Sequence, residues 1–151
     1  MIVNTAVAAG TGFLIAVLWF DLMFDVQTRG YGGPTLPAEV LSSISTYYRR
    51  VTTQANPMGR LVAIVMGLTL VALIVEIVED DLRWNSWLSL AIALCAFGLT
   101  GARTLPNAVR LGRATDPPDV QTQFARAIYR DHLFSLAAMT VVLGLRLTTR
   151  V

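Results

Sequence analysis

The chain contains no lysine, one histidine and one cysteine among its 151 residues. Charged residues are also scarce, at 15% of the sequence against about 25% in soluble domains, whereas hydrophobic residues make up 54%. A single histidine and a single cysteine argue against zinc, iron–sulfur and bis-histidine haem sites, which leaves only a carboxylate site open. We therefore expect a membrane protein that carries no metal and no cofactor.

Strong net charge is missing as well. The formal charge is only +2, and arginines in membrane loops have an explanation in topology, so we expect no nucleic-acid partner. The chain has no glycine-rich phosphate loop and no nucleophile elbow. Its lone cysteine, Cys95, lies inside an apolar run, where a buried hydrophobic role is expected and no intramolecular disulfide can form.

Four apolar segments match the roughly 20 residues that a helix needs to cross a bilayer. They predict one all-α domain, a membrane four-helix bundle, with spans at about residues 3–24, 60–78, 84–103 and 129–147. The first span lacks a basic segment before it and a cleavage site after it, so we expect a retained helix. In that span Ala8, Gly12 and Ala16 follow the small-residue spacing that lets helices approach closely in lipid.

The first connection is long and contains an amphipathic segment. From Ala38 to Gln54 apolar residues recur at helical spacing, and Tyr47 and Tyr48 are followed by Arg49 and Arg50. This pattern predicts either a helix on the membrane surface or an extension of the second span.

The fourth span has a short uncharged core, Leu133–Leu145, of about 20 Å. Because the hydrocarbon layer is about 30 Å thick, flanking polar residues must fill the difference. We expect Arg146 to extend outward to the membrane surface and Asp131 and His132 to lie near the opposite boundary. Pro117-Pro118 predicts the start of one helix that continues to about Leu147.

The arginines give the orientation. Nine lie in or beside the first and third connections and three on the other side, the first group being Arg29, Arg49, Arg50, Arg60, Arg103, Arg110, Arg113, Arg126 and Arg130 and the second Arg83, Arg146 and Arg150. This bias predicts a multi-pass protein of the inner (plasma) membrane with both termini on the non-cytoplasmic side.

That topology brings ionisable residues of separate spans to the cytoplasmic end of the bundle, namely Asp21, Asp25, Arg60, Arg103, Arg130, Asp131 and His132. Ionisable groups at membrane depth are costly and usually paired. Two interpretations follow. The group is either a ring of ion pairs that fixes the register of the helices, or a polar pocket that a small lipid-soluble molecule enters. Asp21 and Asp25, four residues apart, are either a solvated helix end or a pair of carboxylates in that site.

The order of motifs resembles the anthrone-oxygenase-like family of small four-helix membrane proteins. The similar pieces are LPAEVLSSISTYYRR, ANPM before the second span, LPNAVRLG after the third and YRDHLFS at the start of the fourth. Pro106 and Asn107 match a proline and asparagine of the family pattern, and Tyr129 and His132 match its aromatic residue and histidine. Ser135 stands where the pattern has an arginine.

The resemblance implies that a lipophilic, polyphenolic substrate is oxygenated without metal or flavin. His132 would be the general base, because the unperturbed pKa of histidine lies near neutrality. Asp131 or an aspartate of the first span would orient it, and Arg103 and Asn107 would stabilise the developing oxyanion. The remaining expected contacts to the substrate are Asp21, Asp25, Tyr129 and Arg130.

Two non-enzymatic alternatives remain open. The chain would serve as an accessory or assembly subunit of a membrane complex, or as a small proton-coupled carrier. Its expected partners are membrane lipid, a small lipophilic substrate, and a membrane-protein partner or a second copy of the chain.

Overall fold

The computed structural model describes residues 2–54, 56–79 and 84–148. This part of the chain is all-α, as expected, and contains no strand. Its helices are α1 (Ile2–Asp25), α2 (Ala38–Arg49), α3 (Asn56–Glu79), α4 (Trp84–Leu99), α5 (Leu105–Arg113) and α6 (Pro118–Thr148).

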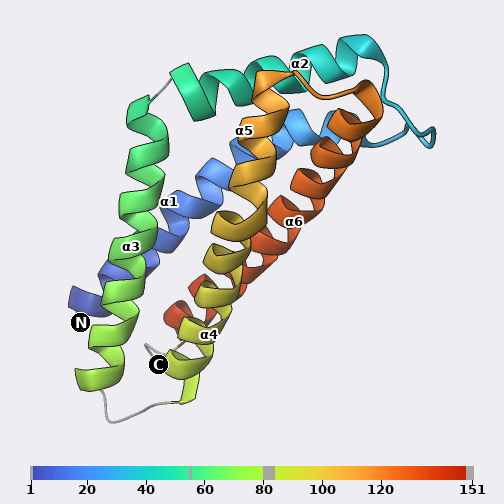
Figure 1. Ribbon diagram of the computed structural model, residues 1–151. Helices are drawn as coiled ribbons and strands as arrows, with labels where there is room; N and C mark the ends of the chain where they lie inside the picture. Colours follow the sequence, from blue (N-terminus) through green and yellow to red (C-terminus); the bar gives the residue numbers. More distant parts are fainter. Residues whose placement is uncertain (1, 55, 80–83, 149–151) are drawn as a thin grey trace.

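Four helical segments run side by side along the molecule (Figure 1). They are Ile2–Thr28, Met58–Glu79, Trp84–Arg113 and Pro118–Thr148, and each is long and apolar enough to cross a membrane. The third segment joins α4 to α5 through the π-helical turn η3 (Thr100–Thr104). The chain is therefore a multi-pass membrane protein, and each expected span lies within one of these segments.

The four segments form a ring. α1 and α4 each pack against both α3 and α6, around a core of Val7, Leu14, Leu73, Ala93, Ala96, Ala138, Met139 and Val142. α1 begins and α6 ends at the same end of the bundle, where Asn4 Nδ2 donates to the Arg146 carbonyl at 3.4 Å (Figure 1). We call this the terminal end. The opposite end, which carries α2, α5 and most of the arginines, is the arginine-rich end.

A second, smaller core lies at the arginine-rich end. α6 has 31 residues and spans about 46 Å, more than the roughly 30 Å of a bilayer core, so one of its ends extends beyond the lipid. α2 lies across the end of the bundle and packs on α5 and α6 (Figure 1). The amphipathic segment therefore forms a lid and does not extend the second span. The buried residues of this second core are Leu36, Val40, Leu41, Ile44, Tyr48, Ala108, Leu111, Ala125 and Ile128.

The crossing of α2 and α5 depends on Gly112. A Cβ atom there would lie 2.7 Å from the backbone nitrogen of Arg49 and 2.9 Å from the carbonyl carbon of Tyr48. Backbone atoms cannot move aside as side-chain ends can, so only glycine permits this approach. Arg49 Nε then donates to the Gly112 carbonyl at 3.0 Å, which joins the two helix ends.

Close packing of the first span occurs at a different glycine from the one expected. Gly12 has open space beyond its Cβ position, and Ala16 is exposed. The tight approach is at Gly10, where a Cβ atom would lie 2.3 Å from Thr69 Oγ1 of α3. Spacing alone could not decide between these positions, because small residues occur on both sides of α1.

Candidate functional site

The π-helical turn η3 sets the position of two polar side chains. Pro106, just after it, has no N–H, and its ring clashes with the carbonyl four residues earlier, so a regular α-helix cannot run through this point. The helix widens instead, and the N–H of Leu105 donates to the Thr100 carbonyl five residues before it. Such π-turns are common at functional sites. Here the turn directs Arg103 and Thr104 toward α6.

Asp131 of α6 receives both of these side chains. Arg103 Nε donates to Asp131 Oδ2 at 2.9 Å, and a terminal nitrogen of the same guanidinium contacts Oδ1, so the pair is bidentate. Thr104 Oγ1 adds a third hydrogen bond to Oδ2 at 3.1 Å. The Asp131 side chain is 1% exposed, whereas that of Arg103 is 54% exposed. The carboxylate is thus fixed and neutralised on the inner side, and the guanidinium also faces outward.

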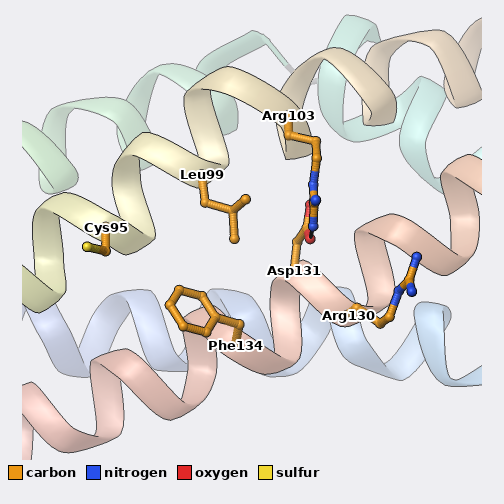
Figure 2. Close-up of a pocket in the computed structure, with 6 residues that line it drawn as sticks. All are labelled: Cys95, Leu99, Arg103, Arg130, Asp131 and Phe134. Carbon is orange, nitrogen blue, oxygen red and sulfur yellow. Dashed lines mark hydrogen bonds and ion pairs between the residues drawn. The ribbon is translucent and has the colours of Figure 1, made fainter.

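A groove of about 520 Å³ opens beside this pair, between α4–η3 and α6. Figure 2 shows Leu99 and Phe134 facing each other across it, with Arg103 reaching to Asp131 at its polar end. Arg130 lines the groove beyond that pair. Cys95 lies toward the apolar end and is exposed, so the expected burial of this residue is wrong. The site therefore combines a charged end with an apolar end.

His132 belongs to a second group of contacts, directed into the bundle. Its Nδ1 lies 2.6 Å from Asp25 Oδ2, and its Nε2 lies 3.9 Å from Asp21 Oδ2. The hydrogen bond between Nδ1 and Asp25 Oδ2 orients the imidazole ring. His132 is 7% and Asp25 0% exposed, which excludes a solvated helix end for Asp25. The imidazole is held between two carboxylates of α1.

Two consecutive tyrosines connect the lid to the same carboxylates. Tyr47 Oη donates to Asp21 Oδ1 at 2.5 Å, and Tyr48 Oη donates to Asp25 Oδ1 at 2.6 Å. Burial, and then the neighbouring negative charges, raise the pKa of both phenols. Tyr48 is the more deeply buried of the two. Both therefore remain protonated donors at neutral pH. The Tyr47 ring also stacks on Phe24 at 4.0 Å between centroids.

The expected site residues divide into three sets. Arg103, Arg130 and Asp131 gather at the groove, and Asp21, Asp25 and His132 gather in the buried cluster. Asn107 and Tyr129 are half-buried and make no hydrogen bond to either set among the described residues. The groove is lined by Asp131 and not by the adjacent His132, because consecutive residues of a helix point about 100° apart.

Sequence reasoning missed the two tyrosines and Thr104 as members of the site. Tyr47 and Tyr48 were expected only as part of an amphipathic face. Their role depends on the angle at which α2 crosses the bundle, which no local pattern gives. For Thr104 the signal was present, since a proline two residues later disturbs the regular helix register.

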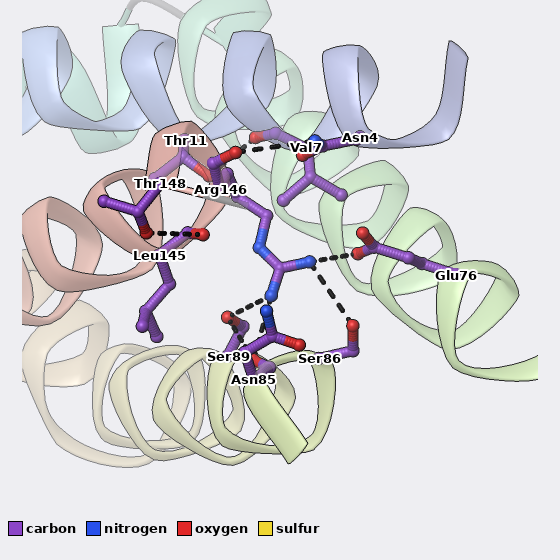
Figure 3. A network of polar contacts seen from close by, with 10 residues as sticks. All are labelled: Asn4, Val7, Thr11, Glu76, Asn85, Ser86, Ser89, Leu145, Arg146 and Thr148. Carbon is purple, nitrogen blue, oxygen red and sulfur yellow. Dashed lines mark hydrogen bonds and ion pairs between the residues drawn. The ribbon is translucent and has the colours of Figure 1, made fainter. Parts of the chain in front are cut away.

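A further polar network lies at the terminal end, around Arg146 (Figure 3). Arg146 was expected to extend outward, but it is 1% exposed and points into the bundle. Its guanidinium contacts Glu76 of α3 and donates to Ser89 Oγ at 2.8 Å and to the Asn85 carbonyl at 2.9 Å, both on α4. These partners replace water, so the charge stays inside.

The structure describes residues 2–54, 56–79 and 84–148. Within those ranges no group of three or more His, Cys, Asp or Glu side chains is arranged to hold a metal ion. The three closest candidates, Asp21, Asp25 and His132, already satisfy one another and the two tyrosines.

The fold and the site together define a class of protein. It is a four-span membrane bundle, closed at one end by a helical lid, with a buried Asp–His–Asp cluster and an arginine-lined groove beside it. No family model, curated protein or solved structure matches the chain.

Proposed function

We propose that this chain is an integral protein of the plasma membrane that binds a small lipophilic molecule in the groove between α4 and α6. The observation that carries the proposal is the lining of the groove, which changes from Arg103, Arg130 and Asp131 at one end to Leu99 and Phe134 at the other. Small-molecule sites have this composition, mostly apolar with a few polar groups, and volumes of about 300–1,000 Å³.

The arginine bias supports a cytoplasmic position for this end of the bundle and its groove, with both termini on the opposite side, as part of this proposal. A bilayer-facing opening lets a lipid-soluble ligand enter from the membrane without crossing water. A second copy of the chain or a membrane-protein partner stays a prediction.

The test is to fill the groove. Leu99→Trp adds bulk at its apolar wall, and Leu94→Trp adds the same bulk on an exposed face of α4 that does not line it. Organic-soluble molecules that copurify with each variant are extracted and compared by mass spectrometry. We expect a compound that wild type and Leu94→Trp retain and Leu99→Trp loses. Equal extracts from all three proteins would refute ligand binding in the groove.

Cofactor-free oxygenation is the second candidate, and the His132–Asp25 contact favours it. A histidine whose Nδ1 is held by a carboxylate has the arrangement of an oriented general base. It would remove a proton from the carbon between the rings of a polycyclic phenolic substrate, and the carbanion would form a C–O bond with O₂. The peroxide anion would take the proton back from His132, and loss of water would leave a carbonyl at that carbon. Because His132 lies behind Asp131 and does not line the groove, the side chains between them must move during turnover.

Oxygen uptake with an anthrone as substrate tests this candidate. We expect turnover in wild type, none in His132→Gln, and near-normal turnover in Arg113→Gln, an exposed arginine outside both sets of site residues. Undiminished uptake by a folded His132→Gln protein would remove the oxygenase proposal and leave ligand binding untouched.

A further inference from the structure

The groove's residues lie on two helical faces. Cys95, Leu99 and Arg103 follow one another at four-residue spacing along α4 and η3, and Arg130 and Phe134 have the same spacing on α6. Residues four apart lie on one face of a helix, so the groove runs parallel to the helix axes. From Arg103 to Cys95 it extends about 12 Å.

The charges at the polar end do not cancel. Arg103 is paired with Asp131, which leaves Arg130, and within the described ranges Arg130 has no carboxylate partner. Asp21 and Asp25 do not compensate for it, since neither lines the groove and their oxygens are taken by His132, Tyr47 and Tyr48. The groove therefore presents one uncompensated positive charge at the membrane boundary.

Arg103 supplies further donors. Its Nε and one terminal nitrogen are directed to Asp131, and the rest of its N–H groups are not used there. Since its side chain is half exposed, these N–H groups are available to a ligand that lies beside Arg130. A guanidinium held rigidly by a carboxylate is well placed to bind an anionic oxygen, because little side-chain freedom is lost on binding.

We propose that the groove binds an amphiphile with a single anionic group, whose charged end lies at Arg130 and Arg103 and whose apolar part runs along Leu99 and Phe134 toward Cys95. This inference rests on the proposed ligand-binding function and narrows it to a class of ligand. A length of about 12 Å is shorter than one leaflet of hydrocarbon, about 15 Å, which favours a compact free amphiphile over a bilayer phospholipid.

Photo-crosslinking tests the proposal directly. The full chain is reconstituted in phosphatidylcholine vesicles with a decanoate that carries a diazirine at the end of its chain. After illumination the modified peptides are mapped by mass spectrometry, with unlabelled decanoate, methyl decanoate or decylamine as competitor. We expect saturable labelling at Cys95, Leu99 or Phe134 that decanoate displaces and that the neutral ester and the amine do not.

Arginine variants test which positive charge binds the anionic group of the ligand. Loss of a charge-assisted hydrogen bond removes about 1.5–3 kcal/mol, so Arg130→Gln should raise the half-saturating concentration about tenfold or more. Arg113→Gln, which removes an exposed arginine outside the groove, should label as wild type does. Equal melting temperatures of the two variants would show that the loss is not due to unfolding.

The outcomes separate the two proposals. Displacement by the methyl ester as effective as by decanoate overturns the anionic ligand and leaves lipophile binding in place. Failure of every competitor to displace labelling at these residues overturns both. Addition of phosphatidylglycerol to the vesicles gives the last outcome, since displacement by that lipid at membrane concentrations would overturn the choice of a free amphiphile.

Discussion

The surroundings of the charged side chains differ between the two ends of the bundle. His132 and Arg146 lie on the same helix, about 21 Å apart along its axis. The Arg146 side chain is 1% exposed, and its guanidinium contacts Glu76, Ser89 and the Asn85 carbonyl inside the bundle. At the arginine-rich end the buried Asp131 is paired with Arg103, whose side chain is 54% exposed and borders a groove.

This difference separates a structural role from a binding role. The Arg146 network connects α6 with α3 and α4, and none of its residues lines the groove. Its contacts therefore stabilise the arrangement of the helices. The Arg103–Asp131 pair joins only η3 and α6 and keeps donors on its outer side. A site that binds ligands needs unused donors that are exposed. Among the described residues the Arg146 network also has a polar atom without a hydrogen-bond partner, Asn85 Oδ1, but that atom is buried and out of a ligand's reach.

The largest expected effect is at the closed end. Arg146→Met leaves Glu76, which is 7% exposed, as a buried carboxylate without its cation, and breaking a buried pair in this way costs about 3–5 kcal/mol. Thermal unfolding in mild detergent should show a large fall in the midpoint. The double variant Arg146→Met/Glu76→Gln should recover most of the loss, because no charge then remains unpaired. A single variant as stable as wild type would contradict the structural role.

The lid gives the next largest effect. Tyr48→Phe removes a hydrogen bond to the Asp25 carboxylate at a position 2% exposed, and we expect a loss of about 1.5–3 kcal/mol. Tyr47→Phe keeps the ring that stacks on Phe24 and changes a half-buried site, so its loss should be about 1 kcal/mol or less. Denaturation of both variants under the same detergent conditions measures the ratio of the two losses in unfolding free energy. Equal losses would show that burial of the carboxylate is not the deciding factor.

Alkaline pH should weaken the same end. The pKa values of Tyr47 and Tyr48 are raised in the folded protein, so above about pH 10, where phenols of the unfolded chain lose their protons, unfolding releases protons. Their contribution is therefore complete below that pH and is lost as pH rises further, by up to about 1.4 kcal/mol per pH unit for Tyr48. The variant Tyr47→Phe/Tyr48→Phe should be less stable at pH 8 but show a flatter decline between pH 10 and 11. A parallel decline in both proteins would refute the assignment.

Much of the fold could be predicted, because membrane spans depend on length and composition. Four spans, the lid segment and the continuous fourth helix from Pro118 follow from such patterns. The gathering of Asp21, Asp25 and His132 at one end follows from antiparallel topology, and so does the Arg103–Asp131 pair.

The facing of individual side chains could not be predicted. Membrane helices are apolar on all sides, so no periodicity distinguishes the face toward the bundle from the face toward lipid. Arg146 was therefore expected at the surface although its partners Glu76 and Ser89 lie inside. The division of adjacent residues Asp131 and His132 between groove and interior depends likewise on helix rotation, which only the packed structure gives.

The smallest expected change in stability is at Arg130, the groove residue that carries the ligand proposal. Its side chain is exposed and has no carboxylate partner in the described part of the chain, and surface substitutions of this kind usually alter stability by less than about 0.5 kcal/mol. Arg130→Gln should therefore have the same melting temperature as wild type but a lower affinity for an anionic amphiphile. Arg146→Met should instead lower the melting temperature. A marked loss of stability in Arg130→Gln would mean that the open end also depends on its charges for helix packing. The contrast between a closed structural network and an open binding site would then no longer hold.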